Sequence, residues 1–424
     1  MNKVSWIYSI IPISAVSNGL SILIPLYILH FNGNVFDIGL TMAFFNLILI
    51  PSSIFWGYFT NKIRKLRTFI LMSVLFTFPI FIVLYFLTQT SSVMLLDRIQ
   101  IIELTYVLFA FIATAASPSI NILVIKQRKN TSLPHFFSRY GITMVIGAIV
   151  GFVPGILLKN SDIAYYIYFL MLLNLFALVL SYVLIEKDKI KYSKKILPKI
   201  GITTNLFLLL NTLTQIPNTI ISTNFTQKLH NSLINKHKRN IYLILSSIAF
   251  FNLGLNLVNT SYIAYLVKYG ILNSNIFVIN IFNQIGQVSI YFIIIMFITK
   301  IKLNKFYKSS ILIRSIAYVL ILIPIFFIRT VLIINLVAYM VAGFAYAIWL
   351  MSSSVLLYQQ IIGKNTANYI GIWLALLGFS SLIGSLLSGI ISRDFGFAYT
   401  FALAIIANIF AILIFYKIKN QSKK

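Results

Sequence analysis

Residues 57–67 read "GYFTNKIRKLR", and four of the last six residues are Lys or Arg. Apolar runs lie on both sides of this segment, at residues 36–59 and 68–88. A run of about 20 apolar residues is long enough to cross a bilayer as a helix. A dense basic segment between two such runs is typical of a loop that joins two membrane spans on the cytosolic side.

The rest of the chain repeats this pattern. Its 424 residues are 59% hydrophobic and only 10% charged, and the mean hydropathy is +0.93. A water-soluble core cannot hide so much apolar surface, so lipid is the expected solvent. We therefore expect an all-α membrane protein with twelve transmembrane helices, at about 6–29, 36–59, 68–88, 93–116, 139–158, 164–185, 241–266, 275–299, 309–328, 330–358, 369–392 and 397–416.

Residues that commonly carry enzyme chemistry are scarce. The chain has no cysteine, which excludes disulfides and Cys-ligated zinc. It has no glycine-rich phosphate loop with its lysine. The four histidines fall at span ends or in loops: His30, His135, His230 and His237. We expect no enzyme activity, no cofactor and no metal site.

Positive charge is distributed unevenly along the chain. The formal net charge is +27, and most of the 34 Lys and Arg residues fall in alternate connecting segments. The positive-inside rule places those segments and both termini in the cytosol. We expect anionic membrane lipids, rather than nucleic acid, to be the partner of these charges.

The chain is expected to divide into two halves. An N-terminal six-helix bundle (1–185) and a C-terminal six-helix bundle (241–424) flank a basic cytosolic connector (186–240). The second half echoes the first at an offset of 234 residues, as in Asn18 and Asn252 or Gly155 and Gly389. Parallel repeats of this kind are a plan found among membrane transporters.

Small residues at a spacing of four mark the fifth and eleventh runs. They are Gly147, Gly151 and Gly155, and then Ser381, Ser385 and Gly389. Such a face lets a second helix backbone approach closely, so we expect helix packing there. We further expect Gly151 to lie at a contact between the two halves.

The opening segment resembles the loop signature of the major facilitator superfamily, G-x-x-x-D-[RK]-x-G-[RK]-[RK]. Gly57, Lys62 and Lys65 match it, whereas Asn61 replaces the signature Asp and Arg64 its second glycine. The segments "FDIGLTMAFFNL", "LLDRIQ" and "SRYG" also resemble family members at the same places. The resemblance implies two six-helix bundles, a cytosolic gating loop at 57–65, and secondary transport of a small solute by a monomer in the plasma membrane.

Two groups of polar residues are candidates for the transport site. Glu103 is a carboxylate deep in the fourth run, where charge is costly, and is therefore a candidate for proton coupling. The resemblance implies that runs 1, 4, 7 and 10 line a central cavity. The expected lining residues are Asn18, Arg98, Asn252, Asn256, Asn259, Tyr346 and Trp349.

Two further charged residues have simpler expectations. Asp37 begins the second run and is expected to cap its N-terminus. Arg314 lies about six residues into the ninth run, so its side chain is expected to reach the membrane surface. Arg98 lies nearer the outside and could bind an anionic substrate.

Three functions remain open from the sequence. The first is proton-coupled transport, with a weak indication of efflux from the glycine spacing of the fifth run. The second is a facilitative uniporter in which Glu103 is structural. The third is a lipid flippase or lipid-processing membrane enzyme, which would need a lateral opening or a cluster of catalytic residues at one surface.

A cysteine at Ser193 tests the topology, because the natural chain has no other thiol. We predict that a membrane-impermeant thiol reagent labels Ser193→Cys only after the cells are permeabilised. Labelling of intact cells from outside would contradict the cytosolic placement of the connector.

Overall fold

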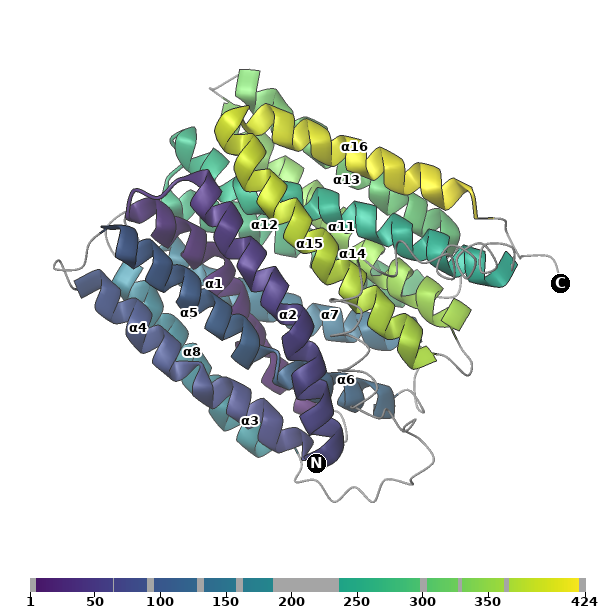
Figure 1. Cartoon of the computed structure of the whole chain (residues 1–424), viewed down its shortest axis with the longest axis horizontal. Helices are drawn as coiled ribbons and strands as arrows, with labels where there is room; N and C mark the ends of the chain where they lie inside the picture. The colour runs from purple at the N-terminus through teal and green to yellow at the C-terminus, as the bar shows by residue number, and fades with distance from the viewer. Residues whose placement is uncertain are drawn as a thin grey trace, which may run out of the picture.

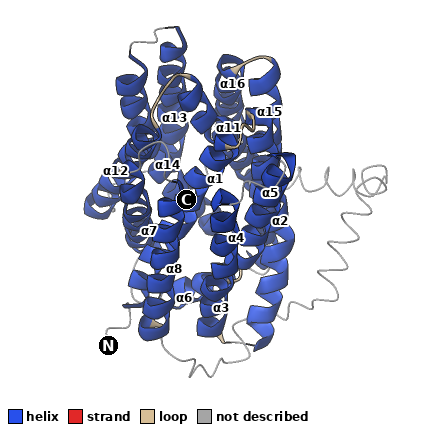
Figure 2. Ribbon diagram, turned by 90° about the vertical axis from the view of Figure 1, so that its left-hand side faces the viewer, coloured by secondary structure: helices blue, strands red, loops and turns tan. Residues whose placement is uncertain are grey.

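The computed structural model describes residues 5–63, 65–89, 95–127, 133–157, 163–185, 236–297, 303–326, 330–361 and 366–418. Within these ranges the chain forms helices joined by short turns (Figure 2). Twelve stretches of helix there are long and apolar enough to cross a membrane. The predicted all-α, twelve-span architecture is therefore confirmed.

The first half opens with a short 3-10 helix, and two of its six spans are built from two helices each. Its elements are η1 (Ser5–Ser9), α1 (Ile10–His30), α2 (Val35–Ile63), α3 (Leu66–Phe76), α4 (Phe78–Gln89), α5 (Leu95–Ala113), α6 (Ala116–Gln127), α7 (Leu133–Ile156) and α8 (Ile163–Leu184). The second half contains α11 (Lys236–Lys268), α12 (Asn273–Phe297), α13 (Leu303–Phe326), α14 (Val331–Ile361), α15 (Thr366–Asp394) and α16 (Phe397–Tyr416).

The third and fourth spans are interrupted, which the hydropathy pattern did not predict. The hydroxyl of Thr77 donates to the carbonyl of Val74 at 2.6 Å where α3 gives way to α4. The hydroxyl of Thr114 similarly donates to Ala110 between α5 and α6. A proline follows each break, Pro79 and Pro118, and proline cannot donate the helical hydrogen bond.

The two ends of the bundle differ. With twelve spans, the chain enters and leaves at one end, here called the terminal end. The opposite end, with the turns at 31–34, 269–272 and 395–396, is the distal end. The halves lie side by side, and α2 packs along α15 while α7 packs along α12 (Figure 1).

The distal end is closed by a core that both halves share. One hydrophobic cluster includes Tyr27 and Ile38 from the first half and Tyr262 and Ile263 from the second, and we call it the distal core. Towards the terminal end the halves have separate clusters, around Trp6 in the first half and around Phe251 in the second. A smaller cluster around Val145, also on the terminal side, joins α7 of the first half to α12 and α14 of the second.

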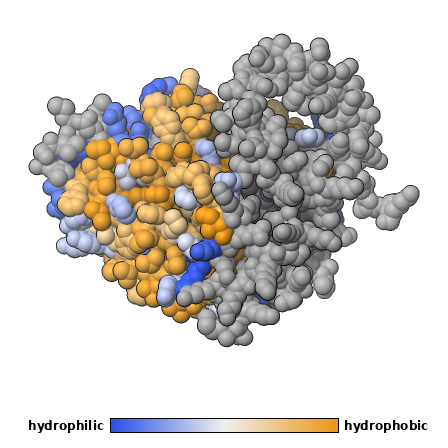
Figure 3. Space-filling model, turned by 60° about the horizontal axis from the view of Figure 1, so that its bottom comes forward, coloured by the Kyte–Doolittle hydropathy of each residue, from blue (hydrophilic) through white to orange (hydrophobic). Residues whose placement is uncertain are grey.

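The outside of the bundle is apolar. On α8, Leu172, Phe176 and Val183 are all more than half exposed. Figure 3 shows hydrophobic side chains spread widely over the part of one face that grey atoms leave visible. Lipid tails are the natural cover for such a surface.

The three glycines of the small-residue face on α7 have different neighbours. A Cβ on Gly147 or Gly151 would collide with the backbone of α1, at Ile11 and Ala15. A Cβ on Gly155 would collide with the ring of Phe277 on α12. The expectation that Gly151 lies between the halves is therefore wrong, because its neighbour α1 belongs to its own half; Gly155 has that position instead.

The predicted location of the connector and the predicted domain boundaries both depend on residues 186–240. Residues 186–235 of the predicted connector lie outside the described residues, so its location stays a prediction. Helix α11 begins at Lys236, inside the predicted connector, and continues without a break to Lys268. The boundaries 1–185, 186–240 and 241–424 remain predictions.

Gly151→Leu tests the packing of α7 on α1. The added side chain meets the backbone of Ala15, and overpacking of this kind costs about 1–3 kcal/mol. We expect a lower thermal unfolding temperature for the purified protein. Gly57→Leu is the matched control, because nothing lies within 4 Å of a Cβ there; equal stability of the two variants would contradict the packing.

Candidate functional site

Glu103 lies beside an apolar groove between α2 and α5. The groove has a volume of about 560 Å³, and its lining comprises Phe44, Leu47, Ile48, Ile50, Pro51, Gln100, Glu103, Leu104 and Val107. The hydroxyl of Thr41 on α2 lies 3.3 Å from Oε1 of Glu103 and 2.8 Å from the carbonyl oxygen of Asp37. Glu103 thus sits where two helices of the first half meet.

This groove opens on the outside of the first half. On α2, Ile38 and Met42 pack into the distal core. Pro51, which lines the groove, is nine residues from Met42, about half a turn round the helix axis at 100° per residue. Leu47 and Leu104 at the groove are 49% and 61% exposed. Glu103 therefore faces towards lipid rather than towards the second half.

The asparagines of α11 divide into two kinds. Asn252 is buried and donates to Leu377, Ser380 and Ser381 of α15 at 2.7–2.9 Å. Asn256 also donates to Ser381. Asn259 is exposed, although residues 257, 258 and 260–262 around it are buried. Of the three, Asn259 is the one whose side chain opens to the surroundings.

The remaining candidates for the cavity lining lie at different levels along the bundle. Asn18 donates to Ser14 on its own helix, beside α7. Arg98 lies over the ring of Phe31 at the distal end, 5.1 Å from its centroid. Tyr346 is half-buried, whereas Trp349 is 3% exposed and stacks on Phe251 of α11. The structure does not bring all of these residues to one place.

Arg314 is the residue that sequence reasoning misplaced. Its side chain is 2% exposed and does not reach the membrane surface. Helix α13 begins at Leu303, six residues before the predicted run, so Arg314 is about three turns inside the helix. The hydrophilic segment "LNKFYK" at 303–308 concealed this earlier start. The guanidinium bonds to Tyr318, Ala342 and Asn259.

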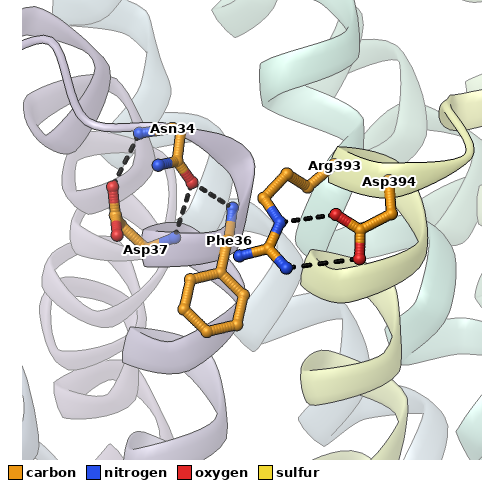
Figure 4. Close-up of polar contacts among 5 residues, drawn as sticks. All are labelled: Asn34, Phe36, Asp37, Arg393 and Asp394. Atoms are coloured by element: carbon orange, nitrogen blue, oxygen red, sulfur yellow. Dashed lines mark hydrogen bonds and ion pairs between the residues drawn. The ribbon is translucent and has the colours of Figure 1, made fainter.

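At the distal end, Arg393 and Asp394 of α15 and Phe36 of α2 form a contact between the halves, which we call the distal seal (Figure 4). Arg393 of α15 pairs with Asp394 at 2.7 Å and lies 4.6 Å from the ring centroid of Phe36 on α2. A cation over an aromatic ring is attracted to its face. This contact joins the two halves at the ends of α2 and α15.

The start of α2 is capped differently from the sequence prediction. The side chain of Asn34 accepts hydrogen bonds from the backbone of Phe36 and Asp37. Asp37 in turn accepts from the backbone of Asn34 at 2.8 Å. Asn34 is therefore the N-cap and Asp37 the third residue of a capping box. This arrangement holds Phe36 at the seal.

The predicted packing and gating residues occupy the α2–α15 side. Ser385 accepts from Asn46 of α2 at 3.2 Å, and Gly389 meets Gly39 of α2. Asn61 and Lys62 end α2, and Lys65 directly precedes α3. Arg64 lies outside the described residues. Gly57 has no neighbour within 4 Å of its side-chain position, so gating by residues 57–65 remains a prediction.

Potential metal-ligating side chains lie apart in the part of the chain that the structure describes. There, no three His, Cys, Asp or Glu side chains come close enough together to hold an ion. What the geometry offers instead is two charged side chains in separate halves, Glu103 and Arg314, and an interface that is sealed at one end.

Several solved structures of membrane transporters are similar to this chain in fold. The D-xylose-proton symporter has a TM-score of 0.70 at 13% identity, covering 99% of this chain and 98% of that one. The xylose transporter XylE from E. coli, described as partially occluded and inward open, has a TM-score of 0.68 at 12% identity and 99% coverage of both chains.

A third neighbour is the nucleoside transporter NupG, with a TM-score of 0.65 at 14% identity, covering 99% of this chain and 98% of that one. A sequence comparison with curated proteins finds no match. The family model of the Major Facilitator Superfamily matches residues 6–368. That match covers most of the chain, and with the twelve spans it shows that the chain belongs to the major facilitator superfamily of membrane transporters.

Proposed function

We propose that this protein is a secondary transporter that moves a small solute by rocking its two halves around a central site. The distal core carries this proposal, because it is the larger of the two clusters that join the halves, while towards the terminal end each half also has a cluster of its own and the smaller Val145 cluster joins α7 to α12 and α14. A transporter that alternates access must be able to close one end and open the other. The structure corresponds to the state closed at the distal end.

The orientation follows from the charge distribution of the sequence. With both termini in the cytosol of a plasma-membrane protein, the distal end faces outside and the present state faces inward. The similarity to XylE, described as inward open, supports this reading. Anionic lipids of the inner leaflet then contact the basic terminal end. The glycine spacing of α7 is a weak indication that the direction is export.

Glu103 is the proposed proton carrier. Thr41 has one hydroxyl hydrogen, and the carbonyl of Asp37, at 2.8 Å, is its nearer acceptor. The same hydroxyl lies 3.3 Å from Oε1 of Glu103, so it donates only a weak hydrogen bond to this carboxylate, which is left able to gain and lose a proton.

Helix α2 provides the link between Glu103 and the gate. One face of α2 packs on α15 through Gly39 and Asn46, and another holds Thr41 against Glu103. When the distal seal opens, α2 loses its partner α15 and its position against α5 can change. A different affinity of Glu103 for the proton in the two states is what coupling requires.

Two alternatives predict different behaviour. A uniporter would use the same motion with Glu103 as a structural hydrogen-bonding residue. A lipid flippase would need a lateral opening for a headgroup, and the groove beside Glu103 is lateral. That groove, however, lies between α2 and α5 of one half rather than between the halves, which favours solute transport.

A disulfide across α2 and α15 tests the proposed motion. Asn46 and Ser385 lie within hydrogen-bond distance across the halves, at 3.2 Å. We expect oxidation of the double variant Asn46→Cys/Ser385→Cys to stop transport and reduction to restore it. The control pair Ser392→Cys/Thr400→Cys bridges two helices of one half, where the hydroxyls lie 2.8 Å apart, and should not block transport. Transport by the oxidised Asn46–Ser385 pair would refute the proposal.

Glu103→Gln tests the coupling. The variant keeps the hydrogen bond to Thr41 but cannot carry a proton. In proteoliposomes we expect proton-driven accumulation to fall to the level of empty vesicles, while counterflow exchange continues. Asp37→Asn removes another carboxylate near the distal end and should retain proton-driven transport. If Glu103→Gln still concentrates solute with a proton gradient alone, Glu103 is structural and the coupling proposal fails.

A further inference from the structure

A buried positive charge in the second half has no role in the mechanism above. Arg314 lies eleven residues into α13 and six residues, about 9 Å along the helix axis, beyond Lys308, the last lysine of its hydrophilic start. With 2% of its surface exposed, it cannot place its charge in water. A charged side chain at this depth is costly and calls for compensation.

The partners of Arg314 are all neutral. Nη1 donates to the carbonyl of Ala342 on α14 at 2.8 Å, and Nε donates to the hydroxyl of Tyr318 at 2.9 Å. Nη2 donates to the side-chain oxygen of Asn259 on α11 at 3.3 Å. Within the described ranges the one ion pair is Arg393–Asp394, at the distal surface. The protein thus solvates this guanidinium without neutralising it.

Asn259 connects the buried guanidinium to the outside of the half. It is exposed while its neighbours on α11 are buried, and it continues the face that carries Asn252 and Asn256. These three positions, at i, i+4 and i+7, lie on one side of the helix. Its bond to Arg314 is the longest of the three, so Asn259 is the partner most readily exchanged.

We propose that Arg314 and Asn259 bind the carboxylate of a small organic anion, and that the amide oxygen of Asn259 occupies the anion position when the site is empty. A carboxylate oxygen replaces this amide oxygen on Nη2. Rotation of the Asn259 amide then turns its NH₂ group towards the second carboxylate oxygen. The guanidinium thereby gains the negative charge that the described residues do not supply.

The charge count selects a carboxylate over a phosphate. One guanidinium balances one negative charge, whereas a phosphate monoester carries about 1.5 to 2 at neutral pH. The half-buried ring of Tyr346, on the same helix as Ala342, adds an aromatic surface next to the site for the organic part of the anion. This inference rests on the proposed function, because it names the substrate class of the transporter.

A substitution that needs no ligand provides the first test. Asn259→Asp places a carboxylate at 3.3 Å from Nη2 and supplies the missing charge from within the chain. We expect a higher thermal unfolding temperature than that of the natural protein. Asn256→Asp on the same face, whose amide bonds to Ser381 instead, is the control and should not gain stability. Equal shifts for both variants, or no gain for Asn259→Asp, would overturn the proposal.

The second test measures binding to the purified full-length protein. Acetate, lactate and benzoate should raise the unfolding temperature, whereas the matching amides and inorganic phosphate should not. Arg314→Gln should weaken carboxylate binding roughly 10- to 100-fold, since a charge-assisted bond is lost, and Arg314→Lys should weaken it less. Asn259→Asp should abolish the response. Stronger protection by phosphate, no protection by any carboxylate, or protection that survives Arg314→Gln would each overturn the proposal.

These binding measurements are independent of the rocking motion. They can be repeated on the Asn46→Cys/Ser385→Cys protein with its disulfide closed. Carboxylate binding without any effect of the disulfide on transport would retain the anion site and reject the proposed motion. If the disulfide blocks transport but no carboxylate binds, the proposed motion is retained and the anion site is rejected.

Discussion

The contact between Gly39 of α2 and Gly389 of α15 is the constraint on which the closed distal end depends. A Cβ on Gly39 would lie 2.6 Å from the Cα of Gly389, so the two backbones touch. This approach lets Ile38 enter the distal core and brings Phe36 under Arg393. Any larger side chain at either glycine would hold the distal ends apart, and the state closed at this end would be lost.

The same helix contact explains how chemistry could be linked to motion. Helix α2 has α15 on one side and Thr41 facing Glu103 on another, so the seal and the carboxylate share one rigid element. Arg314 lies in the other half, tied to α11 and α14. The buried charge of Arg314 and the half-buried carboxylate of Glu103 thus lie in different halves. A proton bound to Glu103 and an anion bound to Arg314 would therefore occupy separate sites.

The span pattern could be predicted from the sequence because about 20 apolar residues are a physical requirement for crossing lipid. The direction in which single side chains point could not be predicted from the sequence. Gly151 packs on Ala15, and Glu103 opens to an outer groove, because neighbours are set by tertiary packing that periodicity does not encode. Arg314 was placed too shallow since polar residues at 303–308 hid the true start of α13. The spacing of the asparagines marked Asn259 as a candidate in the sequence. Its hydrogen bond to Arg314 could be found only from the structure.

The central claim is that the two ends of the bundle open and close in opposite senses, and spin-label distances test it most directly. One pair would be placed at the terminal end, at the exposed residues Ile63 and Lys305, and one at the distal end, at Tyr165 and Phe395. In vesicles, a proton gradient with a transported solute should shorten the first distance and lengthen the second. Distances that stay fixed, or that change in the same direction at both ends, would contradict the account.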